Sequence, residues 1–213
     1  MSFTEAILQN NPDLLRQILS DGYHPDTRVS GIPAIAHAAL TNRATLVRIL
    51  LEFHANPNHI IGQEPLLLLA IRSCDLEIAR LLLQAGADPN APDVNGYTPL
   101  MMAVDCDVDR IELLIEYGCD LDRVDRRGRS ALHHAVECAQ GAQGAQGAQG
   151  EAIRILLENY ADPDLQDQEG ETPLHRLEYP NQRVIQLFID AFADFSLADQ
   201  RGVTVERYLS GQG

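Results

Sequence analysis

Lysine and tryptophan are both missing from this 213-residue chain, and aromatic residues make up only 5% of it. A chain with so few large rings fills its interior mainly with Leu, Ile, Val and Ala. That composition favours helices packed on helices over an aromatic-rich β-sandwich. In other respects the chain, with 45% hydrophobic and 22% charged residues, has ordinary globular composition.

The missing lysine has two possible explanations, because all 16 cationic side chains are arginines. A base composition that favours arginine codons is the first, although the abundance of isoleucine argues against an extreme bias. Selection against ubiquitin attachment is the second. It is expected of a protein that works beside a ubiquitin ligase or enters a foreign cytosol.

A long hydrophobic run is also missing. The longest, PLLLLAI at residues 65–71, is far shorter than the roughly 20 residues that a helix needs to cross a bilayer. The start, MSFTEAILQNNPD, has neither the basic segment nor the apolar stretch of a secretory signal. With four cysteines in such a chain, we expect free thiols and a cytoplasmic location, either in the protein's own cell or, for a secreted effector, in a host cytosol.

Positive charge is scarce as well, and the net charge is −15. The average surface therefore repels a nucleic-acid backbone or an anionic membrane. We expect the partner to be another protein, with no nucleic acid and no membrane. In the absence of that partner we expect a monomer.

A repeated pattern fills most of the chain. The motifs GYHPD, HANPN, GADPN, GCDLD, YADPD and FADFS begin at residues 22, 54, 86, 118, 160 and 192, so successive copies are offset by 32, 32, 32, 42 and 32 residues. Before each copy lies a segment with apolar residues at helical spacing, such as LEIARLLLQ. After most copies comes a polar stretch with Gly, such as DVNG or DQEG, and then another helix start. Each unit is therefore a two-helix repeat.

The helix starts that follow the polar stretches carry a recognisable motif. TPLMMAV at 98–104, SALHHAV at 130–136 and TPLH at 172–175, together with the GADPN exits, resemble the ankyrin repeat over roughly residues 1–209. Thr98 and Thr172 suit a helix N-cap that is followed by proline. The resemblance implies an all-α fold, an ankyrin-repeat α-solenoid of about six stacked helix-turn-helix units with short hairpin fingers, one unit carrying an Ala-Gln-Gly loop insertion.

The chain departs from the ankyrin pattern at four positions. Pro33 and Pro65 replace the Thr that opens the helix, and Tyr160 and Phe192 replace the Gly that ends the second helix. Because that Gly normally takes a left-handed conformation, we expect these two helix ends to be looser or differently capped.

The domain boundaries follow from the repeat pattern. We expect one ankyrin-repeat domain over 1–213, with an N-terminal capping unit at 1–28, a partial C-terminal cap at 199–213 and a low-complexity inter-helix insertion at 139–150. The four Ala-Gln-Gly triplets fall inside one unit, and they lack the proline of collagen. A slipped duplication in a surface loop explains them at little entropic cost, and a local docking loop is the alternative. Gly at every third position opposes extension of the flanking helices into the tract.

The histidines and cysteines are candidates for catalytic or metal-binding roles. The resemblance implies a structural role for His133 and His175, which bond neighbouring loops, and partial exposure for His134 and His37 in the next position of the motif. A phosphate-binding Gly loop, a nucleophile motif and the Cys-x-x-Cys or His-x-x-x-His spacing of a zinc site are missing from the sequence. We therefore expect no catalytic residue, no metal and no cofactor.

Cys74, Cys106 and Cys138 recur at the expected turn between the two helices of successive units. Neighbouring helices pack about 8–10 Å apart, whereas a disulfide needs Cα atoms within about 7 Å. We therefore expect these thiols to stay reduced.

In ankyrin proteins the contact residues lie on the hairpin fingers and near the end of the first helix. Carried over position by position, the resemblance gives these partner-binding candidates: Val94, Asn95, Tyr97, Asp105, Arg126, Arg127, Arg129, Glu137, Gln168, Glu169, Glu171 and Tyr179. The stretch DRVDRRGR at 122–129 places four arginines on one finger, beside an acidic finger at 162–171. Two interpretations stay open, namely ion pairing between fingers and recognition of an acidic partner segment by arginine forks.

The sequence thus predicts a non-enzymatic protein-protein interaction module, acting as a scaffold, an adaptor or an inhibitory subunit and possibly as a secreted bacterial effector in host cytosol. Two alternatives are an enzyme whose site is built on the ankyrin stack and an acidic mimic of nucleic acid. The arginine finger weakens the second alternative.

Overall fold

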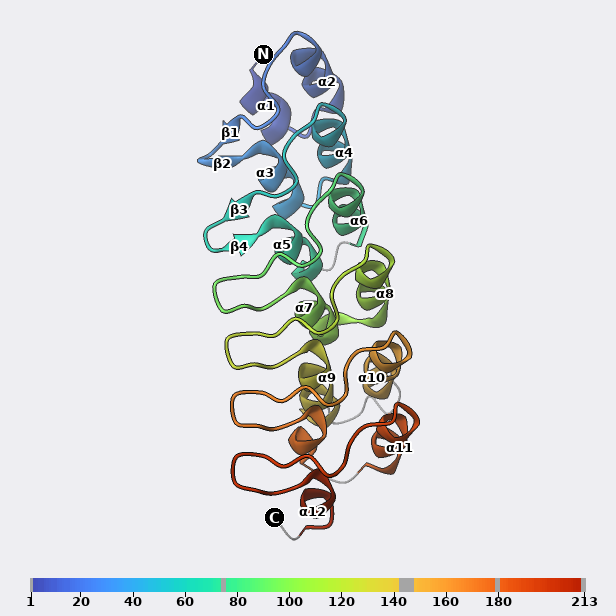
Figure 1. The fold of residues 1–213 in the computed structure, drawn as a ribbon. Helices are drawn as coiled ribbons and strands as arrows, with labels where there is room; N and C mark the ends of the chain where they lie inside the picture. The colour runs from blue at the N-terminus through green and yellow to red at the C-terminus, as the bar shows by residue number, and fades with distance from the viewer. Residues whose placement is uncertain (1, 74–75, 142–147, 179–180, 212–213) are drawn as a thin grey trace. The chain divides into compact units, whose positions relative to one another are not determined.

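The computed structural model describes residues 2–73, 76–141, 148–178 and 181–211, which form two compact units, Met1–Val94 and Asn95–Gly213 (Figure 1). In unit 1, antiparallel helix pairs are joined by short hairpins. Its elements are α1 (Phe3–Leu8), α2 (Pro12–Ser20), β1 (Arg28–Val29), β2 (Ile32–Pro33), α3 (Ala34–Leu40), α4 (Ala44–Glu52), β3 (Ile60–Ile61), β4 (Glu64–Pro65), α5 (Leu66–Arg72) and α6 (Leu76–Gln84).

Unit 2 repeats the helix pairs, but its fingers contain no strands among the described residues. Its elements are α7 (Pro99–Cys106), α8 (Val108–Glu116), α9 (Ala131–Gly141), α10 (Ala148–Glu158), the 3₁₀ helix η1 (Pro173–Arg176), α11 (Gln182–Asp190) and α12 (Val205–Leu209). The first helices of successive repeats pack on one another, as α7 does on α9, and so do the second helices, as α8 does on α10. The predicted two-helix repeat is therefore confirmed.

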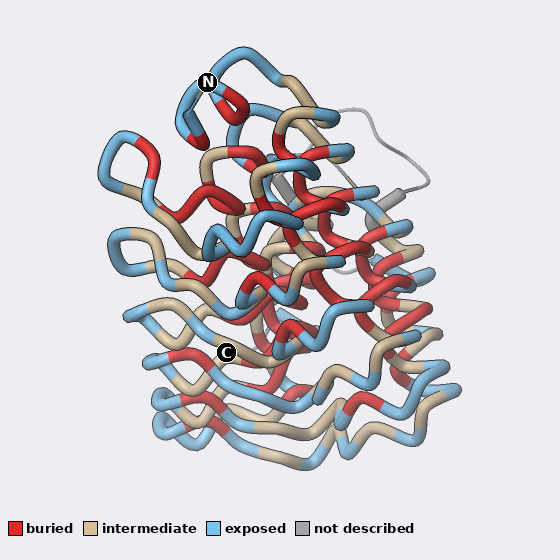
Figure 2. Tube along the Cα trace, turned by 90° about the horizontal axis from the view of Figure 1, so that it is seen from above, coloured by how far each residue is buried: buried red, intermediate tan, exposed pale blue. Residues whose placement is uncertain are grey.

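The core of each unit lies between the two rows of helices. Buried residues run along their facing sides, and the fingertips are largely exposed (Figure 2). Most of the buried apolar residues are Leu, Ile, Val and Ala, as the scarcity of large rings predicted.

The starts of the first helices agree with the sequence analysis. Pro33 and Pro65 occupy the N-cap positions of α3 and α5. Pro99 begins α7 after Thr98, whose hydroxyl accepts the N–H of Met101 at 3.3 Å. A proline in the first turn costs no hydrogen bond, because that N–H has no helical partner.

The helix ends at Tyr160 and Phe192 correct an expectation. Both residues take left-handed φ angles of 68° and 60°, and the N–H of the following residue bonds back over the helix end, from Ala161 to the Leu156 carbonyl at 3.0 Å. The end of α6 at Gly86, with φ 89°, has the same bond from Ala87 to Leu82 at 2.9 Å. These ends are therefore capped in the same way as the glycine ends, because this motif needs the left-handed residue whatever its side chain.

The exits of successive repeats are linked by a ladder of short polar side chains. In unit 1 the Asn56 N–H donates to the Asp26 carboxylate, and the Asp88 N–H to the Asn58 side-chain oxygen, both at 2.9 Å. Unit 2 repeats the pattern, with Asp162 N–H donating to Asp122 at 2.9 Å. Each link satisfies a backbone donor that no helix or strand would satisfy.

The Ala-Gln-Gly tract lies between α9 and α10, within one repeat. Both helices extend into it, since α9 ends at Gly141 and α10 begins at Ala148, while residues 142–147 lie outside the described residues. The expectation that glycine would keep the helices out of the tract is therefore wrong for the first and last triplets. Gly141 ends α9 and Gly150 lies in the first turn of α10, where glycine is less unfavourable than in a helix interior. The extension also places Cys138 inside α9 and not at the turn where it was expected, whereas Cys106 does end α7.

Candidate partner-binding surface

Buried aspartates fix the shape of the fingers in unit 2. Asp125, Asp167 and Asp199 each accept the backbone N–H groups two and four residues further on; for Asp125 these are Arg127 at 2.8 Å and Arg129 at 3.0 Å. Burial alone would raise the pKa of Asp125. The N–H groups and the Arg129 guanidinium outweigh burial and hold the pKa below its usual range. The fingers are thus tied to charged carboxylates.

Successive fingers of unit 2 are hydrogen-bonded tip to tip. The Arg126 N–H donates to the Asn95 carbonyl, and the Gln168 N–H to the Arg127 carbonyl, both at 2.9 Å. The Gln168 side chain adds a bond to the Arg126 carbonyl at 2.8 Å. The backbone of the arginine finger is therefore held on both of its sides.

Glycine makes this close approach possible. A Cβ added at Gly128, whose φ is 80°, would lie 3.0 Å from the Gln168 nitrogen and 3.1 Å from the Asp167 Cα. Contacts that short with backbone atoms cannot be relieved by turning a side chain. The Gly of the DRRG stretch is thus needed both for its left-handed φ and for the space that it leaves.

The arginines of this finger divide into two groups. Arg126 and Arg127 are exposed, and neither makes an ion pair with any residue that the structure describes. Arg129 is half-buried and bonds to Asp125 at 2.9 Å and to Glu137 on α9 at 3.2 Å. Ion pairing between fingers, one of the two interpretations of the sequence, therefore does not account for Arg126 and Arg127.

A second ionic cluster joins the fingers to the first helices. Arg176, at the end of η1, pairs with Asp167, with Glu171 at 3.0 Å and with Glu137 at 3.5 Å. Beside it opens a cleft of about 500 Å³, lined by Glu137, Glu171, His175, Arg176, Glu178, Arg201 and Tyr208. The predicted residues Glu137 and Glu171 thus share one hollow, while Gln168 and Glu169 are exposed at a fingertip.

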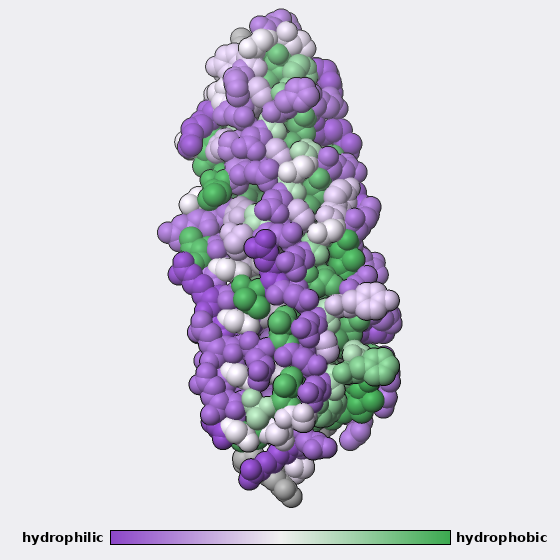
Figure 3. Space-filling model, in the orientation of Figure 1, coloured by the Kyte–Doolittle hydropathy of each residue, from purple (hydrophilic) through white to green (hydrophobic). Residues whose placement is uncertain are grey.

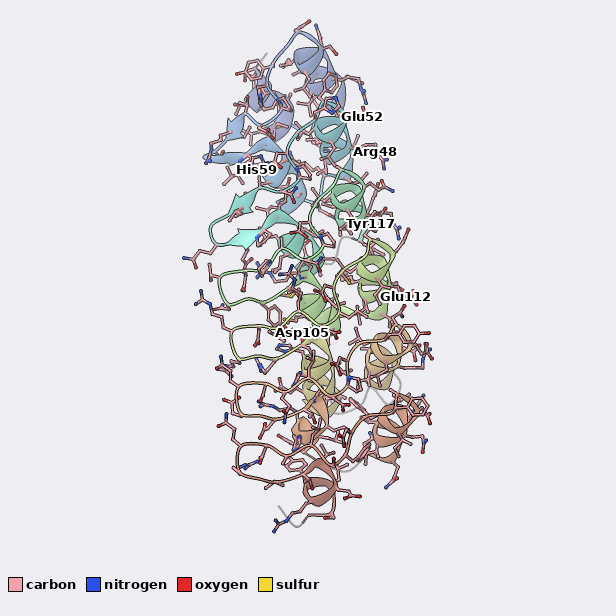
Figure 4. The ribbon with its side chains drawn as sticks, viewed as in Figure 1. Arg48, Glu52, His59, Asp105, Glu112 and Tyr117 are labelled. Atoms are coloured by element: carbon pink, nitrogen blue, oxygen red, sulfur yellow. The ribbon has the colours of Figure 1, made fainter. Side chains whose placement is uncertain are left out.

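Tyr97, Asp105 and Cys138 form a compact polar cluster. The Tyr97 hydroxyl donates to Asp105 at 2.6 Å, and the Cys138 thiol donates to the other Asp105 oxygen at 2.9 Å. In Figure 4 Asp105 lies at the first helix α7, whereas Glu112 and Tyr117 lie on the second helix α8 and at its end. Tyr97 also packs edge-on against the His134 ring, with centroids 5.0 Å apart. Tyr97 is therefore held by neighbours rather than freely mobile.

The chemistry of this cluster is that of a stabilising contact. Burial and the hydrogen bond to Asp105 raise the pKa of the Cys138 thiol to about 12, so it carries little thiolate at neutral pH. His134 was expected to be partly exposed, but it is buried, with 6% of its surface accessible, because the Tyr97 ring covers it. Burial and the nearby Arg129 charge lower the pKa of His134, which bonds to Asp125 at 3.3 Å.

His133 and His175 have the predicted structural role. The Nδ1 atom of His133 accepts the Ser130 N–H at 3.1 Å, and its Nε2 lies 3.1 Å from the Glu171 carbonyl of the next finger. His175 makes the same bridge, with Nε2 3.0 Å from the Val203 carbonyl. Each histidine thus joins its own helix start to the neighbouring repeat.

The twelve predicted contact residues are not one uniform surface. Val94, 43% exposed, ends unit 1, and Asn95 begins unit 2. Arg126, Arg127, Gln168 and Glu169 are fingertip residues, and Tyr179 lies outside the described residues. Tyr97 and Asp105 belong to the polar cluster, whereas Arg129, Glu137 and Glu171 belong to the ion pairs that join the fingers to the first helices. Arg176 and Arg201, which line the cleft, were not among the predicted contact residues. Arg176 follows the motif histidine, as His134 does, and this shared position was the available signal.

Within the described ranges, no group of three or more His, Cys, Asp or Glu side chains is placed to hold a metal ion. Cys106, Cys119 and Cys138 are free thiols. In the described part of the chain, no helix combines the length and the apolar character that crossing a bilayer requires.

Comparison with known proteins supports the family resemblance. A family model of three ankyrin repeat copies matches residues 3–93 and 67–146, and a model of the single ankyrin repeat matches residues 127–168. No curated protein gives a significant match. A crystal structure of an ankyrin repeat domain from Acinetobacter baumannii AYE is 26% identical, covers 90% of this chain and 98% of its own, and has a TM-score of 0.79.

The ankyrin repeat domain of Bcl-3, a member of the IkappaB family, is 24% identical over 99% of this chain and 96% of its own, with a TM-score of 0.80. At that identity the likeness concerns the fold alone. Together with the family models, these structures confirm the predicted all-α solenoid of stacked helix-turn-helix units.

Proposed function

Because the chain belongs to the ankyrin repeat family, whose repeats are in general protein–protein interaction modules, we propose that it binds a protein partner through the fingertips and first helices of unit 2 and catalyses no reaction. Repeat proteins bind partners on extended surfaces built from successive units. The protonated Cys138 thiol and the structural bonds of His133 support a role without catalysis.

One observation carries the proposal. Arg126 and Arg127 project from a finger whose backbone is bonded to both neighbouring fingers, yet within the described residues their guanidinium groups have no acidic partner. The protein has a net charge of −15, so two unneutralised arginines on one finger give this part of the surface a positive charge that differs from the protein as a whole. Because the support is already ordered, binding there loses little conformational entropy.

The chemistry of the partner follows from these two side chains. A guanidinium binds a carboxylate through two parallel hydrogen bonds, and this geometry selects a planar anionic group. The partner segment is therefore acidic, with at least two carboxylates that meet Arg126 and Arg127. The neighbouring cleft is lined by both acidic and basic side chains, among them Glu137, Glu171 and Arg176, so the unpaired arginines of the fingertip are the groups that select the acidic segment.

The role of such a binder is that of an adaptor, scaffold or inhibitory subunit in the cytoplasm. The free thiols of the described cysteines support a reducing compartment. The absence of lysine supports the more specific role of a bacterial effector that works in a host cytosol. Adding exposed lysines should then shorten the lifetime of the protein in a eukaryotic cell, and an unaltered lifetime removes the support that the missing lysine gives to this role.

The binding proposal is tested with charge-reversal variants. The R126E/R127E variant and the wild type are used to capture proteins from cytosol, and the control is R16E/R48E. The control carries the same change of charge on two exposed arginines of α2 and α4 in unit 1. The expected result is a protein that is retained by the wild type and the control and lost by R126E/R127E.

The affinity of the captured protein is then measured for each variant. Central charged contacts contribute about 2 kcal/mol or more, which corresponds to a loss of roughly 30-fold. Equal affinity of the wild type and R126E/R127E for the captured protein would show that the two arginines are not part of the binding surface. A captured species that polyanions such as heparin displace, but acidic peptides do not, would favour the alternative of a nucleic-acid mimic.

A further inference from the structure

Two aromatic residues stand out on a different part of unit 2. Tyr160 and Phe192 are each 92% exposed, the highest values among the exposed large hydrophobic residues. Within the described part of the chain, they are also two of the six non-glycine residues with a left-handed φ. Neither observation is explained by the fingers, because Tyr160 follows α10 and Phe192 follows α11.

These positions favour a smaller residue. The equivalent residues of other repeats are Gly22, Gly86 and Gly118, which have φ angles of 95°, 89° and 71°, and His54, which has φ 64°. A left-handed conformation brings the Cβ of any other residue too close to its own carbonyl, and bulky side chains are unfavourable there. With 92% exposure the two rings gain almost nothing from packing in return, so folding gives no reason for them.

The two rings lie on neighbouring elements. The helix α10 packs against α11, and the two residues follow these helices at the same position of the repeat. Equivalent points on packed helices are about 8–10 Å apart, a distance that one partner surface can span. Ile189, on the last turn of α11, is 49% exposed and adds apolar area. In Figure 3 large side chains project from the flank on which Figure 1 places α10 and α11.

Acidic side chains surround the aromatic pair. Asp162 follows Tyr160 by two residues, Asp194 follows Phe192 by two, and Asp190 ends α11. All three are exposed, and none forms an ion pair with another described residue. Their recorded bonds are to neutral donors, such as the Gln186 amide to Asp190 at 2.8 Å. The rim of the pair is therefore negative and open to an external cation.

We propose that Tyr160, Phe192 and Ile189 form a second docking surface, which takes a protein segment with an apolar face flanked by lysine or arginine. The rings would fill the apolar contact, and Asp162, Asp190 and Asp194 would pair with the cations around it. Large aromatic side chains bury 150–250 Å² each and dominate interface energetics. Burial of the two rings by a partner would offset the unfavourable left-handed φ of Tyr160 and Phe192. The acidic rim and the net charge of −15 disfavour a second copy of this chain as the occupant.

This surface differs from the fingertip surface in both place and charge. The fingertip arginines select an acidic segment, whereas the aromatic surface, here defined as Tyr160, Phe192 and Ile189 with their aspartate rim, selects a basic and apolar one. The two surfaces can therefore be tested independently with variants of the same full-length protein.

The test uses a fluorescent synthetic peptide of leucine and lysine, patterned as an amphipathic helix, and measures its binding by anisotropy. The variants are the wild type, Y160G/F192G and H54G. The last makes the same change to glycine at a left-handed position in unit 1 but removes neither a tyrosine nor a phenylalanine ring. Two further peptides serve as probes, one in which glutamate replaces lysine and one in which serine replaces leucine.

The expected result is a loss of at least about tenfold in affinity for the leucine–lysine peptide in Y160G/F192G, with little change in H54G. The melting temperature of Y160G/F192G should be unchanged or higher, since glycine relieves both left-handed residues. R126Q/R127Q should bind this peptide as the wild type does. A loss in affinity without a loss in stability separates a docking role from a structural one.

Several results would overturn the proposal. Equal binding of the peptide by the wild type and Y160G/F192G would show that the rings are not a docking surface, and so would a melting temperature lowered by the double change. Equally tight binding of the leucine–glutamate or serine–lysine peptide would exclude the stated chemistry. A dimer in sedimentation, or binding to phosphatidylcholine vesicles, that Y160G/F192G abolishes would replace the proposed occupant by a second copy or by a membrane.

Discussion

Replacing Gly128 by alanine tests how closely the fingers must approach one another. The matched control is Gly118→Ala, since Gly118 also has a left-handed φ, of 71°, but a Cβ there would meet no atom within 4 Å. Alanine at Gly118 costs only the left-handed conformation, about 1–2 kcal/mol of unfolding free energy. At Gly128 the short contacts with the backbone of Asp167 and Gln168 add about 1–3 kcal/mol, the usual range for overpacking.

Both variants are measured by thermal unfolding, followed by circular dichroism. In a domain of this size 1 kcal/mol changes the melting temperature by about 2–4 °C, so Gly118→Ala should lower it by about 2–8 °C. Gly128→Ala should lower it by at least about 2 °C more. Hydrogen exchange should locate the difference, with a faster exchange of the Gln168 N–H in Gly128→Ala only. If both variants melt together, the finger spacing is not constrained by the missing Cβ and the argument is wrong.

Three further predictions follow from the structure. Burial lowers the pKa of His133 and His134, so the unfolded chain takes up protons below about pH 6.5 that the folded chain does not. The free energy of unfolding, measured by urea denaturation, should therefore fall from pH 7 to pH 5 by at most about 1.4 kcal/mol per pH unit for each histidine, and the fall should be smaller in His133→Gln. Deletion of residues 142–150 should change the melting temperature by less than about 5 °C, and a larger drop would assign the tract a structural role. Thiol titration of the non-reduced native protein should find all four cysteines; with a thiol pKa of about 12, Cys138 should react more slowly than in Asp105→Asn, and equal rates would refute the role of Asp105.

The repeat pattern and its helices could be predicted from the sequence because they depend on local periodicity. Apolar residues at helical spacing, with Thr98 and Pro99 at a helix start, identify an element without knowledge of its neighbours. The bridge from His133 to the next finger was predicted from the motif alone. Both features can be recognised from the sequence of a single repeat.

The pairing of long side chains could not be predicted in this way. Arg126, Arg127 and Arg129 lie within four residues of one another, yet only Arg129 reaches Asp125 and Glu137. Which arginine turns inward depends on the path of the finger, which the Asp125 carboxylate sets through backbone bonds. The burial of His134 depends on the Tyr97 ring of the preceding repeat, so it too is a property of the stack.

The capping of the helix ends at Tyr160 and Phe192, which replace the usual Gly, was predicted wrongly from the sequence. The expectation rested on intrinsic backbone preference, which opposes a large residue with positive φ. The hydrogen bonds over the helix end, such as Ala161 N–H to the Leu156 carbonyl, impose that φ regardless of residue type. Intrinsic backbone preference alone therefore predicted the wrong capping for these two helix ends.

Because the hydrogen bonds between exit side chains are the same from repeat to repeat, whole repeats can be removed or added without loss of these bonds. In unit 1 the Asp26 carboxylate accepts the N–H of Asn56, and Asn58 accepts that of Asp88. A deletion of residues 56–87 would bring the Asp88 N–H opposite Asp26, and the same bond would close with a shorter protein. A deletion or duplication of a whole repeat therefore leaves each exit side chain opposite a backbone N–H of the next repeat. A deletion of any other length would leave one exit side chain without this hydrogen bond. Arrays of this kind can gain or lose recognition surface in a single genetic step.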